Sequence, residues 1–407
     1  MRFVIFTGAL RNIPFPACFR FCHNYAGFGR KDEAAPHHDN NDMINILHTI
    51  DTTGPGGAET VFIDLASRLA RARYTPTVAI TGPGWVADEL RRRGFDPAML
   101  ATQASFDANY VRQLLRIIRR HRIDIVQSHL FGSNIYCSAA GFLSRTPVVS
   151  VFHGAVDVAK RERFVKAKFG VVNAGSAAVV CVSDHLRQSL LQTTNLSARK
   201  AVTIYNGIDT RRFFPRRDTG VRTALGIADD DIVVGTIGNI RRPKAYDVLM
   251  RAARWLADRS PKFKFIVAGA GGNRLHEELL ALRAQLKLED RVFFIDFRAD
   301  AEVVLNNCDV FALSSSSEGF SIATLEAMAC GVPVAVTRSG GPEEIVTHEA
   351  NGLLVPTQAP DALAQAIERL AGDAALRARL IAAAHRLVES KFTLDAMVAQ
   401  YEQLYAR

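Results

Sequence analysis

The stretch SSSSEGFSIATLEAMACGVPVAVTRSGGPEEIV, from Ser314 to Val346, decides the fold because it joins a helix and a strand through tight turns. The apolar segment VFAL comes directly before it and is typical of a buried strand. The segment Glu318–Phe320 predicts a turn, and helix-forming residues follow from Ile322 to Cys330. Gly331–Pro333 ends that helix, and the apolar run Val334–Thr337 is typical of a parallel strand. The stretch therefore predicts one strand–helix–strand unit of an α/β sheet.

Two glutamates flank the turn in this unit. Glu318 lies in the turn, and Glu326 follows eight residues later in the predicted helix. A carboxylate only accepts hydrogen bonds, so the paired hydroxyls of a sugar or a ribose are suitable partners. Ligands of open α/β sheets bind just past the carboxyl ends of the strands, beside helix N-termini. Two alternatives stay open: Glu326 stabilises the start of its helix, or the two carboxylates are an acid/base pair for glycoside hydrolysis.

The length and the charge of the chain narrow the possible classes of protein. With 407 residues the chain exceeds one ordinary core, so two domains are expected. No stretch has the roughly 18 uninterrupted apolar residues of a membrane-spanning helix. Residues 43–215 carry 22 basic and 12 acidic residues, a net charge of +10, whereas residues 216–407 have a net charge of −2. The basic half suits an anionic lipid surface, an acidic acceptor or nucleic acid.

Residues 1–42 differ from the rest of the chain. The apolar run after Arg2 is interrupted by Arg11 and two prolines, and residues 36–42 have no periodicity. We expect this segment to be a disordered tail or the product of a start codon set too early. The folded protein is expected to begin at Met43, where the first strand-like segment opens.

From Met43 onward, strand-like and helix-like segments alternate, which predicts doubly wound parallel sheets in an α/β protein. In residues 43–213 the predicted strands are Ile44–Ile50, Thr77–Ile80, Ile123–Gln127, Val148–His153, Ala178–Ser183 and Val202–Tyr205. The predicted helices of this half are Ala58–Arg71, Ala87–Arg93, Tyr110–Arg120, Asn134–Leu143, Phe164–Ala174 and Asp184–Leu191. We expect this half to be a Rossmann-like domain.

A second alternating run begins after residues 206–217, where the periodicity lapses. Its predicted strands are Ile232–Ile237, Phe263–Ala268, Val292–Ile295, Val310–Leu313 and Val334–Val336. Its predicted helices are Tyr246–Arg259, Leu275–Leu286, Glu302–Asn306, Ile322–Cys330, Asp361–Leu370 and Ala375–Glu389. We expect a second Rossmann-like domain over residues 214–391 and a separate last helix within residues 392–407.

Two segments of the first half carry candidate ligand-binding residues. Gly56 and Gly57 end the loop GPGG after the first strand, where a glycine backbone admits a diphosphate next to a helix start. Tight strand-to-helix turns also require glycine, so this signal is open to both explanations. His153 ends the strand VVSVFH and is expected at the ligand-binding edge, either as a hydrogen-bond donor or as a structural histidine.

The loop GNIRRPK of the second half, residues 238–244, places three cations after a predicted strand. Arg241, Arg242 and Lys244 could hold a diphosphate and stabilise it as it departs, so no metal would be needed. Surface charge is the alternative explanation. The glycines at 269–272 lack the third glycine of a dinucleotide-binding fingerprint, which disfavours a dehydrogenase.

Taken together, these motifs resemble the retaining glycosyltransferases of family 4, which have the two-domain GT-B fold. The family's signature is similar to EGFSIATLE with the EAMACGVPV, SGGPEEI and NGLLVP that follow. Other family landmarks resemble GGAE at 56–59, HG at 153–154 and NGID at 206–209. The resemblance covers the chain from about Met43 to its end. It implies two Rossmann-like domains that face each other, with the last helix crossing back to the first.

For the second half the resemblance implies a donor site. Glu318 would contact the hydroxyls of the transferred sugar, and Glu326 the ribose hydroxyls of the nucleotide. Lys244 would bind the diphosphate, and Phe297 lies where the family binds the base. The backbone near sugar and phosphate would belong to Gly319, Phe320, Ser321 and Ile322.

For the first half the resemblance implies that His153 contacts the donor sugar near the reacting carbon. Gly56 and Gly57 would line the diphosphate. The chain departs from the family at Asn239, where an arginine usually accompanies the lysine, so Arg241 or Arg242 would take over that charge. His153, Lys244 and Glu318 are the residues expected to act in catalysis.

The function implied is transfer of a sugar from a nucleotide-diphosphate donor to a hydroxyl of a saccharide or lipid-linked acceptor, with retention. Neither a cofactor nor a metal is expected, and nucleic acid is not an expected partner. The implied location is cytoplasmic, with peripheral contact to anionic membrane through arginines 116, 119, 120 and 122 and the cluster at 160–168. The alternative is a catalytically silent protein of this fold that binds only nucleotide sugar or membrane.

Overall fold

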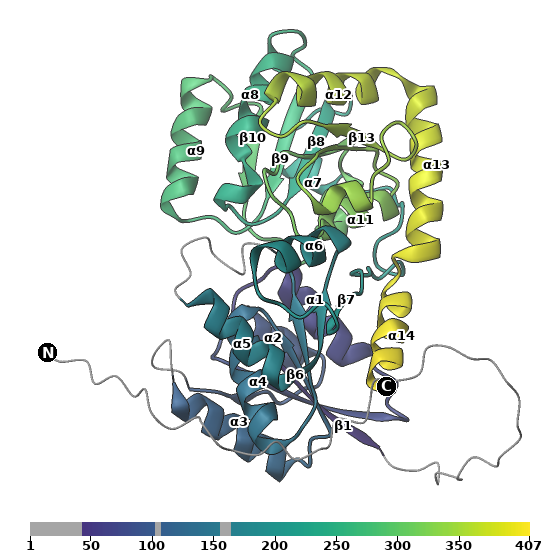
Figure 1. The fold of residues 1–407 in the computed structure, drawn as a ribbon. Helices are drawn as coiled ribbons and strands as arrows, with labels where there is room; N and C mark the ends of the chain where they lie inside the picture. Colours follow the sequence, from purple (N-terminus) through teal and green to yellow (C-terminus); the bar gives the residue numbers. More distant parts are fainter. Residues whose placement is uncertain (1–42, 102–106, 155–163) are drawn as a thin grey trace, which may run out of the picture. The chain divides into compact units, whose positions relative to one another are not determined.

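The computed structural model describes residues 43–101, 107–154 and 164–407, which form two parallel β-sheets wound with helices (Figure 1). The first sheet has seven strands in the order β3-β2-β1-β4-β5-β6-β7, and the second has six in the order β10-β9-β8-β11-β12-β13. All strand pairs within both sheets are parallel. The α/β fold with two doubly wound sheets that the sequence predicts is confirmed.

The N-terminal half comprises the first sheet and its helices. Its strands are β1 (Ile44–Ile50), β2 (Tyr74–Ile80), β3 (Ala98–Met99), β4 (Ile125–His129), β5 (Val148–Phe152), β6 (Ser176–Cys181) and β7 (Ala201–Thr203). Its helices are α1 (Gly57–Arg68), α2 (Trp85–Arg92), α3 (Ala108–Arg120), α4 (Phe131–Ser144), α5 (Val165–Gly175) and α6 (Asp184–Thr193). The central strands are largely buried because helices cover both faces of the sheet.

The C-terminal half comprises the second sheet and its helices. Its strands are β8 (Ile232–Ile237), β9 (Phe263–Ala268), β10 (Val292–Ile295), β11 (Val310–Leu313), β12 (Val334–Thr337) and β13 (Leu353–Val355). The helices are α7 (Gly220–Ala224), α8 (Tyr246–Ala257), α9 (Arg274–Gln285), α10 (Ala301–Asn306), α11 (Ile322–Ala329), α12 (Pro360–Gly372), α13 (Ala374–Lys391) and α14 (Leu394–Tyr405), with short 3₁₀ turns at Arg242–Lys244 and Gly341–Glu344.

The chain order of each sheet reverses next to its first strand. In the first sheet β1 lies between β2 and β4, and in the second sheet β8 lies between β9 and β11. Connections on the two sides of such a strand leave toward opposite faces of the sheet, which opens a ligand site at the carboxyl ends. The loops after β1 and β4, and those after β8 and β11, are therefore the loops that the topology places at ligand sites.

Some predicted elements were displaced or missed. The strand predicted at Ile123–Gln127 is β4 at Ile125–His129, so His129 belongs to the strand. The short edge strand β13 and the two-residue β3 were not predicted. Strands this short carry too few residues for an alternating or apolar pattern, and pairing with a neighbour forms them.

The last helix returns to the N-terminal half. Figure 1 shows α14 beside the N-terminal half. Tyr405, at the end of this helix, donates a hydrogen bond to Gln127 Oε1 of β4 at 2.7 Å. At the start of α14, Ile208 N donates to Phe392 O at 2.9 Å and Leu394 N donates to Ile208 O at 2.8 Å. We propose 43–213, 214–391 and 392–407 as the domain limits, supported by the end of the first sheet at Thr203 and this crossing.

Candidate active site

The loop between β11 and α11 holds Glu318 by its backbone. Glu318 N donates to Ser339 O at 2.8 Å, and Gly341 N donates to Glu318 O at 3.1 Å. The segment SGGPEE after β12 is thus paired with the segment SEGF after β11. Both segments lie at the carboxyl ends of neighbouring strands, because β11 and β12 are parallel and adjacent.

Glu318 and Lys244 form an ion pair at this edge. Lys244 Nζ lies 2.7 Å from Glu318 Oε1, and their side chains are 22% and 12% exposed. Ser315 Oγ donates to the same carboxylate oxygen at 2.5 Å. The ammonium has three donors, so the geometry leaves Lys244 able to bind Glu318 and an anion together. Two residues 74 positions apart in the chain are thus brought into one site.

The loop that carries Lys244 is fixed from several sides. Ser314 Oγ donates to Lys244 O at 2.9 Å, which ties this loop to the end of β11. Tyr246 OH donates to Gly238 O at 2.6 Å. Gly238 has a φ of 158°, and a Cβ there would lie 2.7 Å from Lys244 Cε. Gly238 therefore leaves the space in which the lysine side chain lies.

Asn239 is placed where the family usually has an arginine, and it has a structural role here. Its Nδ2 donates to Pro55 O at 2.7 Å, and its Oδ1 accepts from Ala270 N at 3.1 Å. Arg241 and Arg242 are exposed, and Arg242 pairs with Glu278 at 3.6 Å. Neither arginine joins the pair of Lys244 and Glu318 in this structure.

His153 meets the glutamate loop through the backbone. A Cβ on Gly319 would lie 2.0 Å from His153 O and 2.7 Å from Gly154 Cα, so only glycine fits between them. Ser183 Oγ also donates to Gly319 O at 2.6 Å. The carboxyl ends of the two sheets therefore meet at Gly319, with His153 on one side and Glu318 on the other.

Burial keeps His153 neutral. It lowers the pKa of this imidazole to about 3. His153 Nε2 lies 2.9 Å from His129 Nδ1, and the two rings are stacked with centroids 5.1 Å apart. Desolvation, together with His153 and His48, holds the pKa of His129 well below its ordinary value. Two neutral imidazoles in hydrogen-bond contact can orient a ligand but carry no charge toward it.

Glu326 lies in α11 and is half-buried. Burial raises the pKa of its carboxyl to about 7, with Arg212 opposing the rise and Asp64 and Glu302 adding to it. Arg212 itself is paired with Glu302 at 2.6 Å. The carboxyl of Glu326 makes no hydrogen bond to another residue that the structure describes, so its acceptor capacity is available to a ligand.

The glycine loop after β1 is next to the start of α11. A Cβ on Gly57 would lie 3.3 Å from Ile322 Cδ1, so the start of α1 faces the start of α11. Gly56 lies over the carboxylate of Glu59, where a Cβ would come within 2.3 Å of Oε2. Thr52 Oγ1 holds that carboxylate at 2.6 Å. Phe320 is buried, and Ser321 Oγ is bonded to Thr324 Oγ1 at 2.7 Å.

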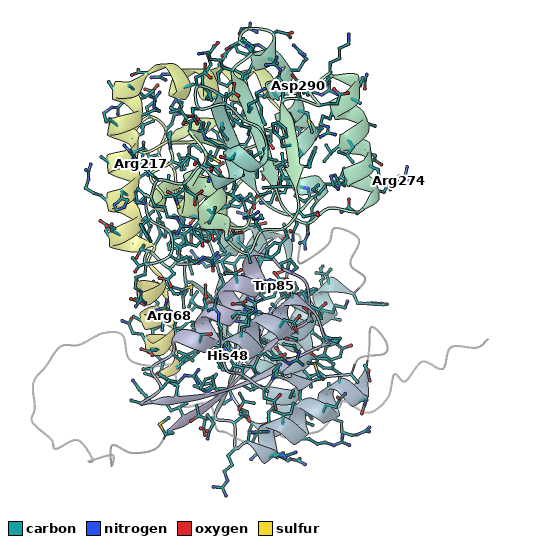
Figure 2. The ribbon with its side chains drawn as sticks, turned by 180° about the vertical axis from the view of Figure 1, so that it is seen from behind. His48, Arg68, Trp85, Arg217, Arg274 and Asp290 are labelled. Carbon is teal, nitrogen blue, oxygen red and sulfur yellow. The ribbon has the colours of Figure 1, made fainter. Side chains whose placement is uncertain are left out.

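Phe297 follows β10 and contacts an aromatic residue that the sequence did not single out. Its ring packs edge to face against that of Trp85 at the start of α2, with centroids 5.5 Å apart. Trp85 is labelled in Figure 2. Asp51, Glu59, His129 and Ser183 were also missed. They lie within ordinary strand and helix patterns, and only the position of Asp51, directly after β1, was a usable signal.

No group of three or more histidine, cysteine or acidic side chains that could hold a metal occurs in the part of the chain that the structure describes. The expectation of transfer without a metal stays a prediction. Lys244, in the loop that follows β8, is the cation that lies beside Glu318 in the described site.

Two parallel sheets with their carboxyl ends in contact are the arrangement of the GT-B fold, and solved glycosyltransferases of this fold are similar to the structure. The structure is similar to Anabaena HepE in complex with UDP-glucose, with a TM-score of 0.80, 26% identity, and coverage of 89% of this chain and 100% of that one. It is also similar to a glycosyltransferase from Rickettsia africae, with a TM-score of 0.78, 21% identity, and coverage of 89% of this chain and 98% of that one.

The sequence comparisons name the family. The chain matches Glycosyltransferase Family 4 over residues 55–212 and Glycosyl transferases group 1 over residues 219–387. A D-inositol 3-phosphate glycosyltransferase of Saccharomonospora viridis is 31% identical over 378 residues, which cover 85% of this chain and 86% of that protein. An N-acetyl-alpha-D-glucosaminyl L-malate synthase of Bacillus anthracis is 27% identical over 310 residues, 74% of this chain and 79% of that protein. The chain belongs to glycosyltransferase family 4.

Proposed function

We propose that the protein transfers a sugar from a nucleoside-diphosphate donor to a hydroxyl of a saccharide or lipid-linked acceptor, with retention of the anomeric configuration. The observation that carries this proposal is the pair of Lys244 and Glu318 at 2.7 Å, beside the backbone contact of Gly319 with His153. Three separate segments thus bring together a carboxylate that accepts hydrogen bonds from hydroxyls (Glu318), a cation suited to a phosphate (Lys244) and a neutral histidine (His153).

In the proposed reaction the bond from the anomeric carbon to the donor phosphate breaks, and the acceptor oxygen forms the new bond on the same face of the sugar. The acceptor proton passes to an oxygen of the departing diphosphate. Lys244 stabilises the charge that develops there, without a metal, and Glu318 holds hydroxyls of the sugar. Glu326 accepts from the ribose, and Phe297 lies beside the base.

The donor is proposed to be a uridine-diphosphate sugar, in view of the UDP-glucose complex of the similar HepE structure. The acceptor is proposed to belong to polysaccharide or glycolipid synthesis. Relatives named for inositol phosphate and malate acceptors show that acceptors differ among similar chains. A panel of donors and acceptors, with nucleotide release as the readout, therefore comes before any finer assignment.

The Lys244→Ala variant tests the catalytic role of the lysine. We expect kcat to fall by roughly 10² to 10³, as for loss of one preorganised charge contact at a developing anion. Arg274→Ala is the control because Arg274 is an exposed residue, with its side chain 90% exposed, and full activity is expected there.

Undiminished transfer by a folded Lys244→Ala variant would contradict the assignment. Donor binding without transfer across the whole panel would favour the silent alternative. Retention is checked separately, from the anomeric proton coupling of the product by NMR, and an inverted product would exclude it.

The proposal includes peripheral binding to anionic membrane. No helix of the described residues is long and apolar enough to cross a membrane. Phe142 and Leu143, at the end of α4, are 65% and 64% exposed. Of the cluster at 160–168, which the sequence also indicated, residues 160–163 lie outside the described residues, whereas Lys166 and Lys168 belong to α5.

The described surface combines these two apolar side chains with exposed arginines. We name it the amino-edge surface: Arg119, Arg120, Arg122, Phe142, Leu143 and Arg145. These residues precede β4 and β5, at the strand ends opposite to the active site, and none of the arginines has an ion pair with another described residue. Apolar side chains surrounded by unpaired cations complement an anionic lipid surface, at roughly 1 kcal/mol per cation. Since five strand residues span about 17 Å, the acceptor hydroxyl would have to project well above the lipid.

Sedimentation with vesicles tests this surface. We expect binding to vesicles that contain phosphatidylglycerol, little binding to phosphatidylcholine alone, and loss of binding in the variant with Arg119→Gln and Arg120→Gln. The control carries Arg251→Gln and Arg274→Gln, which remove the same charge from exposed positions of the C-terminal half. Equal binding to both kinds of vesicle, or equal loss in both variants, would contradict the assignment.

A further inference from the structure

A line of hydrogen bonds runs from the C-terminal helix to His153. Tyr405 OH donates to Gln127 Oε1 at 2.7 Å. Gln127 Nε2 lies 3.4 Å from His129 Nε2, and His129 Nδ1 lies 2.9 Å from His153 Nε2. Gln127 and His129 are two residues apart in β4, so their side chains leave the same face of the sheet. Gln127 and His129 have no exposed surface, and Tyr405 is 9% exposed.

The polarity of this line follows from the donors and acceptors available. The amide of Gln127 accepts through Oε1 and donates through Nε2. Because Tyr405 donates to Oε1, Nε2 faces His129 as a donor, and His129 Nε2 must accept. A neutral imidazole with one nitrogen accepting carries its proton on the other. His129 therefore donates from Nδ1 to His153 Nε2, which leaves the proton of His153 on Nδ1.

We propose that Tyr405, Gln127 and His129 are positioning residues that fix the tautomer of His153, with the proton on Nδ1. The catalytic part rests on the proposed function, since His153 is placed there beside the reacting carbon. The tautomer itself depends only on the hydrogen bonds. His153 is then held as a hydrogen-bond donor through Nδ1 toward its surroundings, and its Nε2 is occupied by His129.

The proposal gives the returning helix a role besides packing. Tyr405 belongs to α14, whose start is bonded to residue 208, where the N-terminal half ends. The end of the same helix reaches β4. Helix α14 and the line of hydrogen bonds thus connect the crossing between the two halves with the orientation of the His153 imidazole.

The neighbours of the line show why a proton cannot move through it easily. Phe62 packs its edge against His129, with centroids 5.4 Å apart. His48 lies in β1 beside Gln127 of β4 and is labelled in Figure 2. Burial lowers its pKa to about 3. Neither the Phe62 ring nor the neutral His48 ring carries a charge, so this core favours a fixed neutral tautomer of His129.

Histidine ring NMR on ¹⁵N-labelled protein tests the tautomer. The chain has 11 histidines, so the signals of His129 and His153 are assigned from the variants His129→Asn and His153→Asn. In the wild-type chain we expect Nδ1 of both rings to be protonated and Nε2 to be bare. A His153 ring protonated on Nε2 would overturn the proposal, whether or not the protein transfers a sugar.

The Gln127→Glu variant reverses the polarity with almost no change of shape. A carboxylate only accepts, so it still accepts from Tyr405 but requires the proton of His129 on Nε2. His129 Nδ1 then accepts, and the proton of His153 moves to Nε2. We expect the NMR signal of His153 to report that exchange and kcat to fall roughly ten- to hundredfold, as when other partners of functional histidines are lost. The KM for the donor should change by less than about threefold.

Tyr405→Phe and Tyr74→Phe form a matched pair of milder variants. Both remove one buried hydroxyl, but Tyr74 OH has no hydrogen-bond partner among the residues that the structure describes, whereas Tyr405 OH donates to Gln127. We expect a fall in kcat for Tyr405→Phe alone. Equal effects of the two variants, or a Gln127→Glu chain whose His153 tautomer is unchanged, would overturn the proposal. If the NMR results hold and no donor is transferred, the proposed function fails and the tautomer assignment stands.

Discussion

Glu318 and Glu326 are only eight residues apart in the sequence, but their side chains have different surroundings. Glu318 is held by Lys244 and Ser315, so it is a paired carboxylate that already has a cation beside it. The carboxyl of Glu326 has no hydrogen bond to the described residues, and burial raises its pKa to about 7. In the proposed function, Glu318 holds the sugar beside the phosphate, and Glu326 gains its hydrogen bonds when the ribose binds.

The raised pKa of Glu326 predicts how the free energy of unfolding depends on pH. Its ordinary value is 4.5, so between pH 4.5 and about 7 the folded state keeps a proton that the unfolded state has lost. The stabilisation from this group is therefore complete below pH 4.5 and is lost as the pH rises to about 7, by up to about 3 kcal/mol. Arg212, Asp64 and Glu302 are the charges that face it.

The Glu326→Gln variant measures this contribution. Denaturant unfolding at pH 5 and pH 7 gives the free energies of both chains, and the wild-type chain should lose more stability than the variant over this interval. Asp51, whose pKa burial raises to about 6, is present in both chains, so its contribution cancels in the difference. The same pH dependence in both chains would show that Glu326 titrates normally.

The loop between β11 and α11 depends on one small residue. Gly319 touches the backbone at His153 and Gly154, which directly follow β5. For Gly319→Ala we expect the loop to be displaced, donor affinity to fall at least about tenfold, and stability to fall by roughly 1–3 kcal/mol. Calorimetric titration with UDP and denaturant unfolding measure the two effects.

Gly54→Ala is the matched control for Gly319→Ala. Gly54 belongs to the glycine loop after β1, and a Cβ there meets nothing within 4 Å. We expect UDP affinity and stability close to those of the wild-type chain. If Gly319→Ala behaved like this control, the close contact between the two loops would not be needed for binding.

On the scale of the whole molecule, the segment at residues 207–208 lies against the segment at residues 392–394, where the chain returns to the N-terminal half. A Cβ on Gly207 would come within 2.2 Å of Thr393 O, directly beside the hydrogen bonds of residue 208. Glu344 adds a second tie, because its carboxylate accepts from Asp184 N at 2.9 Å and His185 N at 2.6 Å at the start of α6. The segment PEE thus caps a helix of the N-terminal half.

The Gly207→Ala variant tests the crossing. We expect a loss of roughly 1–3 kcal/mol in the free energy of unfolding because backbone atoms cannot move aside as a side-chain tip can. Gly372→Ala, at the end of α12 where a Cβ meets nothing within 4 Å, is the control and should be neutral. Denaturant unfolding of both variants decides, and equal midpoints would mean that the crossing is not closely packed.

The elements were predictable from the sequence to the extent that their patterns are local. Strands such as Ile232–Ile237 and Phe263–Ala268 are apolar runs bounded by polar residues, and the structure has them at those positions. β13 and the shift of β4 were not predictable, because a neighbouring strand decides where such short segments pair. Lys244 and Glu318 were candidates from the residues alone, the family resemblance implied their separate roles, and the structure adds that they form an ion pair.

The sequence by itself determined the alternation of strands and helices, the two-sheet architecture and the segments that carry Lys244, His153 and Glu318. Each of these follows from periodicity or from a motif in neighbouring residues. Only the tertiary structure decided that Gly319 lies against His153, that Asn239 binds Pro55, and that Tyr405 is connected to His153 through β4. These contacts join residues between 166 and 278 positions apart in the chain, and no local pattern records a partner so distant.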